Sequence, residues 1–185
     1  MNFTPTPLPG AYTITLTPLQ DERGLFARTF CKQEFEAIGH QAEFVQFNHS
    51  INLKKGTLRG MHFQKPPHTE TKLIRCVAGA VFDVIVDLRA ESPTFLKWFG
   101  AELSAENMMM MYVPDRFAHG FLTLTDCAEL LYHHTGFYTP AAEGGIRFDD
   151  PALHIQWPEK PLIISLKDQH YPLLDNVFTG LTLTS

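Results

Sequence analysis

The stretch that decides the fold is residues 73–88, LIRCVAGAVFDVIVDL. It contains two apolar runs, 73–77 and 81–88, separated by the turn Ala78-Gly79-Ala80. The second run is rich in β-branched residues, which favour a strand over a helix. Its side chains alternate between two faces, with Phe82, Val84, Val86 and Leu88 on one and Val81, Asp83, Ile85 and Asp87 on the other. The stretch therefore predicts two successive strands.

Similar short runs recur along the chain, punctuated by 13 Pro and 12 Gly. Residues 44–47, 121–124 and 129–134 predict further strands, and residues 48–57 predict a polar loop after the first of them. Seven or more short strands in one domain indicate a sandwich or a barrel. We expect an all-β jelly-roll barrel, with a small-molecule site at its mouth or in its interior.

Two helical patches interrupt the strands. Residues 32–38 place Phe35 and Ile38 three apart and predict a short surface helix. In the tail, Ser165 is expected to start a turn or a helical stretch, with Leu166 and the pair Leu173-Leu174 packing back. We expect residues 1–185 to form one domain, with a strand-like N-terminal extension and a short helical tail.

Composition excludes several classes of protein. The 185 residues are 44% apolar and 19% charged, enough to bury a core. Fifteen Lys and Arg against twenty Asp and Glu give a net charge of −5, which argues against a nucleic-acid partner. The most apolar stretch, 78–88, is too short to span a membrane, and the first residues do not resemble a secretory signal. Three cysteines without a Cys-x-x-Cys pair fit a reducing cytoplasm better than a disulfide scaffold or a zinc site.

Nine histidines are the most conspicuous polar feature. Seven stand beside polar or turn residues and are interpreted as surface or hydrogen-bonded side chains: His40, His49, His68, His133, His134, His154 and His170. His62 and His119 differ, because they lie in strand-like, aromatic surroundings. Each of these two, taken alone, is equally compatible with a buried structural histidine.

The patterns for metal binding and nucleophilic catalysis are missing. Gln64 and Phe121 stand where a second histidine would complete a His-x-His pair, and His133-His134 would point to opposite faces of a strand. The sequence has no Gly-x-Ser-x-Gly elbow, and Cys76 lies in an apolar strand where core packing is the simpler role. No glycine-rich phosphate loop is present, and Gly144-Gly145 predicts a turn.

General acid–base chemistry without a metal or redox cofactor is the class that is left. His62, Tyr132, Lys72 and Asp168 offer a base, an acid, a cation and an orienting carboxylate. Their spacing alone does not show that they meet in space.

An ordered series of short blocks sharpens this interpretation. The blocks are DERG (21–24), NHS (48–50), LRGMHFQ (58–64), KL (72–73), FDVIVDLR (82–89), SPTF (92–95), FAHGF (117–121) and IQWP (155–158). With them the chain resembles the dTDP-4-dehydrorhamnose 3,5-epimerases, a family of cupin-like jelly-roll enzymes. The likeness runs from Asp21 to about Asp175.

The resemblance implies a nucleotide-linked 4-keto-6-deoxyhexose as substrate and a proton removed next to its C4 ketone. His62 matches the family's base, and Asp168 matches the carboxylate that orients the base, as in a catalytic triad. Tyr132 matches the acid on the other face of the sugar. Lys72 matches the cation beside the C4 oxygen. No cofactor and no metal are implied.

The resemblance also implies a binding set. Arg23 and Arg59 match partners of the diphosphate, for which a forked guanidinium is suited. The other matches are Gln46 and Asn48 toward the nucleotide, His119 and Tyr138 beside the sugar, and Glu143 and Lys167 as further contacts. Surface or scaffold roles are alternatives for the last two. A homodimer is implied as well, with an exchanged N-terminal strand that brings Arg23 or Phe26 to the neighbour's site.

Some positions depart from the family pattern. Arg28 stands where a glutamate is common, Leu96 and Arg116 replace expected glycines, and methionines fill 108–111. The nucleotide (dTDP or another such as CDP) and the inverted centres (C3, C5 or both) therefore stay open. Alternatives are a 3,4-ketoisomerase, a non-catalytic sugar-nucleotide-binding module and a metal-dependent oxygenase on the same barrel.

Overall fold

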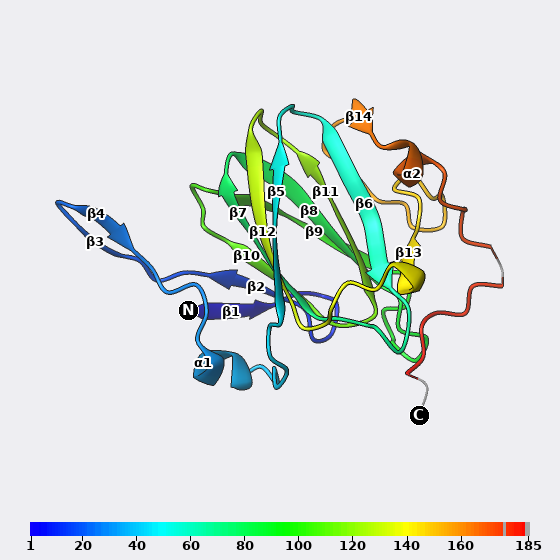
Figure 1. Ribbon diagram of the computed structural model, residues 1–185, viewed down its shortest axis with the longest axis horizontal. Helices are drawn as coiled ribbons and strands as arrows, with labels where there is room; N and C mark the ends of the chain where they lie inside the picture. Colours follow the sequence, from blue (N-terminus) through cyan, green and yellow to red (C-terminus); the bar gives the residue numbers. More distant parts are fainter. Residues whose placement is uncertain (176, 184–185) are drawn as a thin grey trace.

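Two β-sheets face each other in the computed structural model, which describes residues 1–175 and 177–183 (Figure 1). The first sheet has the order β1 (Asn2–Pro5), β2 (Tyr12–Thr15), β10 (Met110–Val113), β7 (Lys72–Ala78), β12 (Ala128–His134), β5 (Gln46–Asn52). The second has the order β13 (Glu143–Gly145), β6 (Thr57–Gln64), β11 (Phe117–Thr123), β8 (Ala80–Asp87), β9 (Trp98–Ser104), with β14 (Ile163–Ile164) parallel to β6. The predicted all-β, cupin-like jelly roll is confirmed.

The predicted alternation in residues 81–88 is also confirmed. Val81 and Ile85 point between the sheets, where they pack with Ile74, Cys76 and Leu130 of the first sheet. The other face of β8 is covered by the segments that follow β13, through a second cluster that contains Val84, Val86, Leu88, Ile146, Leu153 and Trp157. Both faces of β8 are therefore buried, and Asp83 and Asp87 are buried together with its apolar side chains.

Two predicted boundaries were wrong because strand pairing overrides local polarity. Strand β5 continues through Asn48 and Ser50, which pair with Tyr132 and Leu130 of β12, so the predicted loop at 48–57 begins too early. Gly144 lies in β13 and pairs with Phe63, where a turn was predicted. A Cβ on Gly144 would lie 2.6 Å from the Phe63 ring, so glycine allows this close packing.

Both predicted helical segments are confirmed, but part of the packing predicted for the second one is wrong. Helix α1 (Lys32–Glu36) buries Phe35, and α2 (Leu166–Gln169) starts after Ser165. Leu166 is 74% exposed and does not pack back, because the short helix turns Asp168 inward instead. Leu173 is also exposed, whereas Leu174 packs against the second cluster. A short 3-10 turn, Pro140–Ala142, precedes β13.

No helix among the described residues is long and apolar enough to cross a membrane.

Both positions that replace an expected glycine adopt a left-handed backbone. Leu96 has φ 60° and Arg116 has φ 59°, a region in which a glycine would be unstrained. The Arg116 guanidinium lies 2.6 Å from Glu91 and is held against the second sheet.

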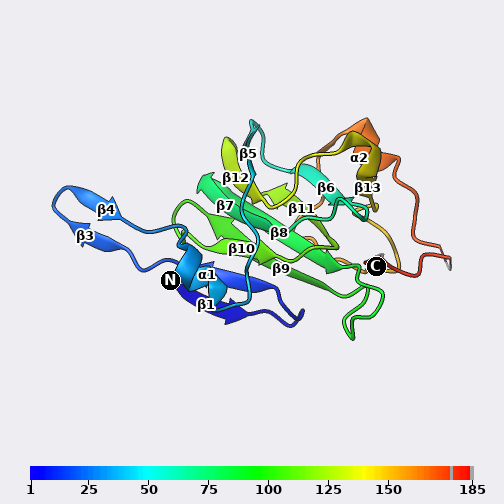
Figure 2. The ribbon, with the colours of Figure 1, turned by 60° about the horizontal axis from the view of Figure 1, so that its bottom comes forward.

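A hairpin of β3 (Leu19–Asp21) and β4 (Gly24–Phe26) extends away from the two sheets (Figures 1 and 2). Its apolar side chains Leu19, Leu25 and Phe26 are between 50% and 73% exposed. We call this hairpin the arm.

Candidate active site

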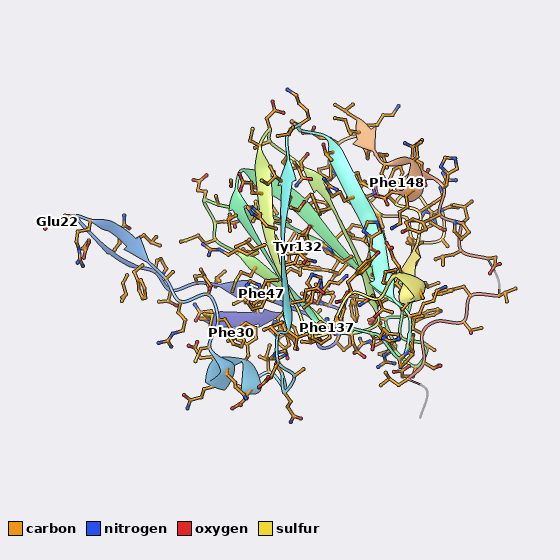
Figure 3. All side chains as sticks on the ribbon, viewed as in Figure 1. Glu22, Phe30, Phe47, Tyr132, Phe137 and Phe148 are labelled. Carbon is orange, nitrogen blue, oxygen red and sulfur yellow. The ribbon has the colours of Figure 1, made fainter. Side chains whose placement is uncertain are left out.

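One polar cavity, of about 290 Å³, opens between the sheets. Five strands contribute to its wall, with Tyr132 near the middle of the sandwich (Figure 3). It is lined by Asn48, His49, Ser50, Arg59, His62, Lys72, His119, Phe121, Tyr132 and His134. Most of these side chains lie on the same inward-facing side of their strands as the core residues, but nearer to the open end. The same alternation of side chains therefore produces both the core and the cavity.

A β-bulge brings Arg59 and His62 to the same face. On β11, His119 pairs with His62 and Phe121 pairs with Arg59, so two steps on β11 match three on β6. The extra residue on β6 lets two side chains three apart both point inward, as bulges beside active sites commonly do. Gly60 lies at this place with φ 126°, and a Cβ there would come within 2.5 Å of the Gly120 backbone.

His62 and Asp168 form a hydrogen-bonded pair. The His62 Nε2 lies 2.8 Å from Asp168 Oδ1, while the Gly60 amide donates to Oδ2 at 3.2 Å. The Asp168 amide donates to the Ser165 hydroxyl at 3.0 Å, which fixes the first turn of α2.

The same contacts keep Asp168 ionised. Burial raises the pKa of Asp168, but its hydrogen bonds with His62, Gly60 and Ser165 outweigh burial and leave this pKa below its ordinary value. Because an ionised carboxylate only accepts, Nε2 carries the hydrogen and Nδ1 of His62 keeps a lone pair. His62 is thus arranged as a base.

Tyr132 belongs to the other sheet and lines the cavity from that side. Its ring lies edge-on to His119, 5.9 Å between centroids, and is stacked on His134 at 6.0 Å. Burial raises the pKa of Tyr132 far above its ordinary value, so the phenol keeps its proton at neutral pH. Tyr132 is thus arranged as an acid that faces the sheet carrying His62.

Two buried carboxylates stand behind the cavity wall, and the sequence analysis assigned a role to neither. Asp83 lies 2.6 Å from His119 Nε2. Burial raises the pKa of Asp83 and lowers that of His119. Glu70 lies 3.4 Å from the Lys72 ammonium. The available signals were an Asp in an otherwise apolar part of a strand and a Glu two residues before the lysine, on the same side of an extended chain.

A second group of predicted residues forms an exposed cluster that is joined to the cavity wall through Asn48, and we call this cluster the rim. Gln46 Oε1 accepts the Tyr138 amide at 3.0 Å, and the Tyr138 hydroxyl donates to Glu143 at 2.8 Å. Lys167 forms an ion pair with the same carboxylate. Gln46 also donates to Asn48 at 3.3 Å, which joins the rim to the cavity wall.

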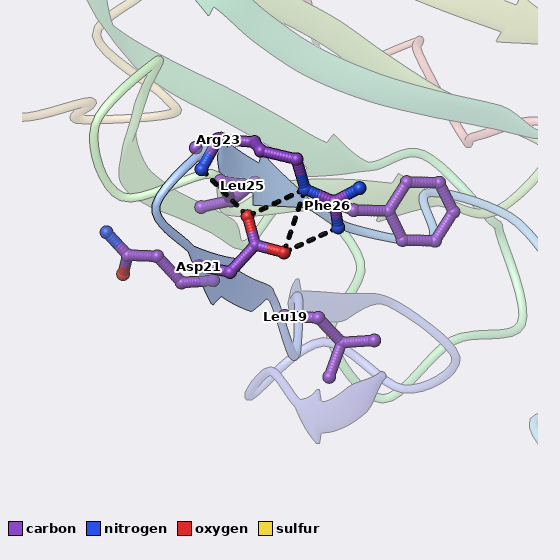
Figure 4. A pocket seen from close by; sticks show the side chains of 7 residues that line it. Leu19, Asp21, Arg23, Leu25 and Phe26 are labelled. Carbon is purple, nitrogen blue, oxygen red and sulfur yellow. Dashed lines mark hydrogen bonds and ion pairs between the residues drawn. The ribbon is translucent and has the colours of Figure 1, made fainter.

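Arg23 and Phe26 are the predicted residues that do not lie at this cavity. Both belong to the arm, where Arg23 forms a forked ion pair with Asp21 beside Leu19, Leu25 and Phe26 (Figure 4). Arg28 lies nearby and forms an ion pair with Glu34 at 2.9 Å. Arg59, in contrast, lines the cavity and donates to Asn52 at 2.7 Å.

Within residues 1–175 and 177–183, no three His, Cys, Asp or Glu side chains converge on a point that would hold a metal ion.

Comparisons with known proteins point to one family. The model of the family described as dTDP-4-dehydrorhamnose 3,5-epimerase matches residues 5–176. A Salmonella typhimurium protein of that name is 47% identical over 92% of this chain and 93% of its own. A Streptomyces niveus dTDP-4-dehydrorhamnose 3-epimerase is 38% identical over 94% of this chain and 84% of its own.

A solved structure extends the similarity to the fold. The Legionella pneumophila dTDP-6-deoxy-D-glucose-3,5-epimerase, in complex with dTDP-4-keto-L-rhamnose, superposes with a TM-score of 0.91. The two chains are 37% identical, and the match covers 100% of this chain and 99% of the other. The chain therefore belongs to the dTDP-4-dehydrorhamnose 3,5-epimerase family.

Proposed function

We propose that this protein is a carbohydrate epimerase that converts dTDP-4-dehydro-6-deoxy-D-glucose to dTDP-4-dehydro-L-rhamnose by inverting C3 and C5. The observation that carries the proposal is the placement of His62, which is hydrogen-bonded to Asp168, and of the Tyr132 phenol on two sheets that face one cavity. A base and an acid on two walls are what inversion by proton transfer requires.

The first step is removal of a proton next to the ketone. Nδ1 of His62 takes the hydrogen from C3 or C5, and the electron pair of the C–H bond moves into a C–C double bond. The C4 carbonyl becomes an enolate oxygen. The Lys72 ammonium stabilises this negative charge, and Asp168 stabilises the imidazolium that forms.

The second step returns a proton to the opposite face. The Tyr132 phenol donates its hydrogen to the same carbon, the carbonyl forms again, and the centre is inverted. The imidazolium and the phenolate then reset by exchange with solvent. Protons and electrons balance without a redox partner, so we propose that no cofactor and no metal take part.

The remaining cavity and rim residues serve substrate binding in this proposal. The sugar lies between the two sheets beside His119, and the diphosphate meets Arg59. The nucleotide extends over the rim, which holds Gln46, Asn48, Tyr138, Glu143 and Lys167.

We also propose a homodimer in which the arm of one subunit reaches the neighbour's cavity and brings Arg23 and Phe26 to it. An isolated two-stranded hairpin with exposed apolar side chains is marginally stable in water, so it is expected to be covered. We propose the cytoplasm as its location, because a reducing compartment suits the free cysteines Cys31, Cys76 and Cys127.

Turnover in heavy water tests the function directly. The protein is incubated with dTDP- and CDP-4-keto-6-deoxyglucose, and NMR follows deuterium at C3 and C5 and the configuration of the product. We expect deuterium at both carbons of the dTDP sugar, and loss of exchange in His62→Ala. Normal exchange in this variant would remove His62 as the base.

The same spectra distinguish the alternatives. Exchange at C3 alone identifies a single-centre epimerase, and a carbonyl at C3 identifies a ketoisomerase. Binding without exchange identifies a non-catalytic module.

A further inference from the structure

The buried carboxylate Glu70 has no part in the steps described above, although it is the ion-pair partner of Lys72. Its side chain is 7% exposed, and that of Lys72 is 10% exposed. One oxygen lies 3.4 Å from the Lys72 ammonium, and the other lies 2.9 Å from Nδ1 of His134. Glu70 therefore joins the cation of the cavity to a histidine on the neighbouring strand.

Hydrogen bonds connect His134 to the rim, and in this series each group donates to the next one toward Glu70. Gln46 donates to Asn48 Oδ1, so Asn48 presents its NH₂ group to His134 Nε2 at 3.3 Å. Nε2 must then accept, which leaves the hydrogen on Nδ1 to be donated to Glu70. Each donor in the series meets an acceptor when His134 is neutral and Glu70 is ionised.

Charge agrees with this assignment. Burial raises the pKa of Glu70, but the hydrogen bond from His134 and the charge of Lys72 outweigh burial and lower it overall. Glu70 is therefore a carboxylate at neutral pH, and it balances a buried ammonium that would otherwise be desolvated without an anion.

The backbone around Glu70 is fixed. Lys72 and His134 are paired across β7 and β12. The Thr71 amide donates to the Thr135 hydroxyl at 2.9 Å, and the Thr135 amide donates to the Thr71 carbonyl. Gly136 packs on Glu70 so closely that a Cβ would lie 3.2 Å from the Glu70 Cβ. The carboxylate is thus held in place by both strands.

We propose that Glu70 and His134 are positioning residues for the reaction. Glu70 holds the Lys72 ammonium at the cavity wall, and His134 holds Glu70. A lysine side chain is a flexible four-carbon stem with a point charge, so it needs a fixed anion to place its charge beside one oxygen atom. The inference rests on the proposed role of Lys72 at the C4 oxygen.

Glu70→Gln tests the first half of the proposal, because it keeps the shape of the side chain and removes the charge. We expect kcat to fall about 10- to 100-fold, the range that misplacement of a catalytic group produces, with KM within about twofold of the original. Glu91→Gln is the matched control, since it removes the same charge from an ion pair with Arg116, and we expect it to leave kcat unchanged.

Rescue by a conservative variant supplies a readout that a structural role would not change. His134→Leu should reduce kcat several-fold, and His134→Gln, which keeps an N–H donor, should restore much of it. His133→Leu, on the neighbouring position of β12, is the control.

A double-mutant cycle decides whether Glu70 acts through Lys72. In a Lys72→Met background, Glu70→Gln should cost nothing further, and the neutral pair should fold because both buried charges are gone. A full additional loss overturns the inference. If Lys72→Met lowers kcat but Glu70→Gln does not, the inference fails and the proposed function stands. If Lys72→Met itself has normal kcat, the proposed role of Lys72 fails.

Discussion

At the scale of single residues, the proposed mechanism divides two proton transfers between two sheets. His62 on β6 and Tyr132 on β12 differ in their environments as well as in position. Asp168 keeps the imidazole in the tautomer of a base, while burial keeps the phenol protonated. Substitution of either side chain should therefore stop a different half of the reaction.

Tyr132→Phe should keep proton removal and lose inversion. His62 still exchanges the hydrogen of the substrate with solvent on its own face, so deuterium enters C3 or C5 with retained configuration. We expect the rate of epimerisation to fall about 10²- to 10⁴-fold, the usual contribution of a positioned acid. NMR of substrate recovered from heavy water measures both quantities. Inversion at the original rate would show that another group delivers the proton.

Asp168→Asn should weaken His62 as a base while keeping a side chain of the same shape at position 168. The amide can donate to Nε2 of His62, which favours the tautomer with hydrogen on Nδ1, the wrong nitrogen. By analogy with the catalytic triad, kcat should fall about 10⁴-fold with KM little changed. Nitrogen-15 NMR of the imidazole reports the tautomer. Gln169→Asn, on the next and exposed position of α2, is the control. An unchanged tautomer together with full activity would contradict the orienting role.

At the scale of elements, the bulge in β6 shows which features of a strand a sequence pattern predicts and which it does not. The alternation in residues 81–88 correctly predicted a strand and the side chains that share each of its faces, because period two is local to one strand. Arg59 and His62 are three residues apart, and a regular strand would place them on opposite faces. Both point inward only because β6 has one extra residue relative to β11, which the sequence of β6 alone does not show. Residues 48–52 were not predicted as a strand because their pairing partner, β12, is distant in the sequence.

The end of β8 gives a prediction for stability. Asp87 is fully buried and accepts hydrogen bonds from Arg89, Ser92 and Thr94, which lock the turn after the strand. Burial raises the pKa of Asp87, but these bonds outweigh burial and leave the pKa below its ordinary value of 3.8. Its stabilisation is therefore complete above that value and is lost as the pH falls through the lower, folded-state pKa.

Asp87→Asn should lower the free energy of unfolding at pH 7 by about 1–3 kcal/mol, the cost of leaving buried donors without a charged partner. The difference from the original protein should shrink as the pH drops below the ordinary value of the carboxyl group. Urea titrations between neutral and acid pH measure it. Asp149→Asn, in a partly exposed ion pair with Arg147, should change stability by less than about 0.5 kcal/mol. A constant difference at all pH values would refute the linkage.

At the scale of the whole molecule, the predicted acid–base residues meet at one cavity of a single chain, whereas two residues of the predicted binding set, Arg23 and Phe26, lie on the arm. His62, Tyr132, Lys72 and Asp168 come from three strands and a short helix, and no sequence spacing predicts that they meet. The family resemblance assigned them to one site because it carries information on tertiary structure that spacing lacks. Neither approach assigned a role to Glu70 or Asp83, since their contacts with Lys72 and His119 are visible only once β7, β8, β11 and β12 are in place.

The arm gives the last prediction, which concerns the assembly. Leu19 and Phe26 are about 70% exposed on a hairpin that leaves the body of the chain, and Arg23 is paired only within the hairpin among the described residues. Light scattering at micromolar concentration should therefore give twice the chain mass of 21.0 kDa. The double variant Leu19→Ser with Phe26→Ser should give one chain mass with unchanged far-UV circular dichroism, because the arm contributes nothing to the core. The same arm gives a kinetic expectation. Arg23→Ala should keep the dimer and raise KM about tenfold with little change in kcat, as expected when a phosphate contact is lost but the chemistry is intact. A monomeric mass for the original protein, or an unchanged KM in Arg23→Ala, would leave the arm without a role at the neighbour's cavity.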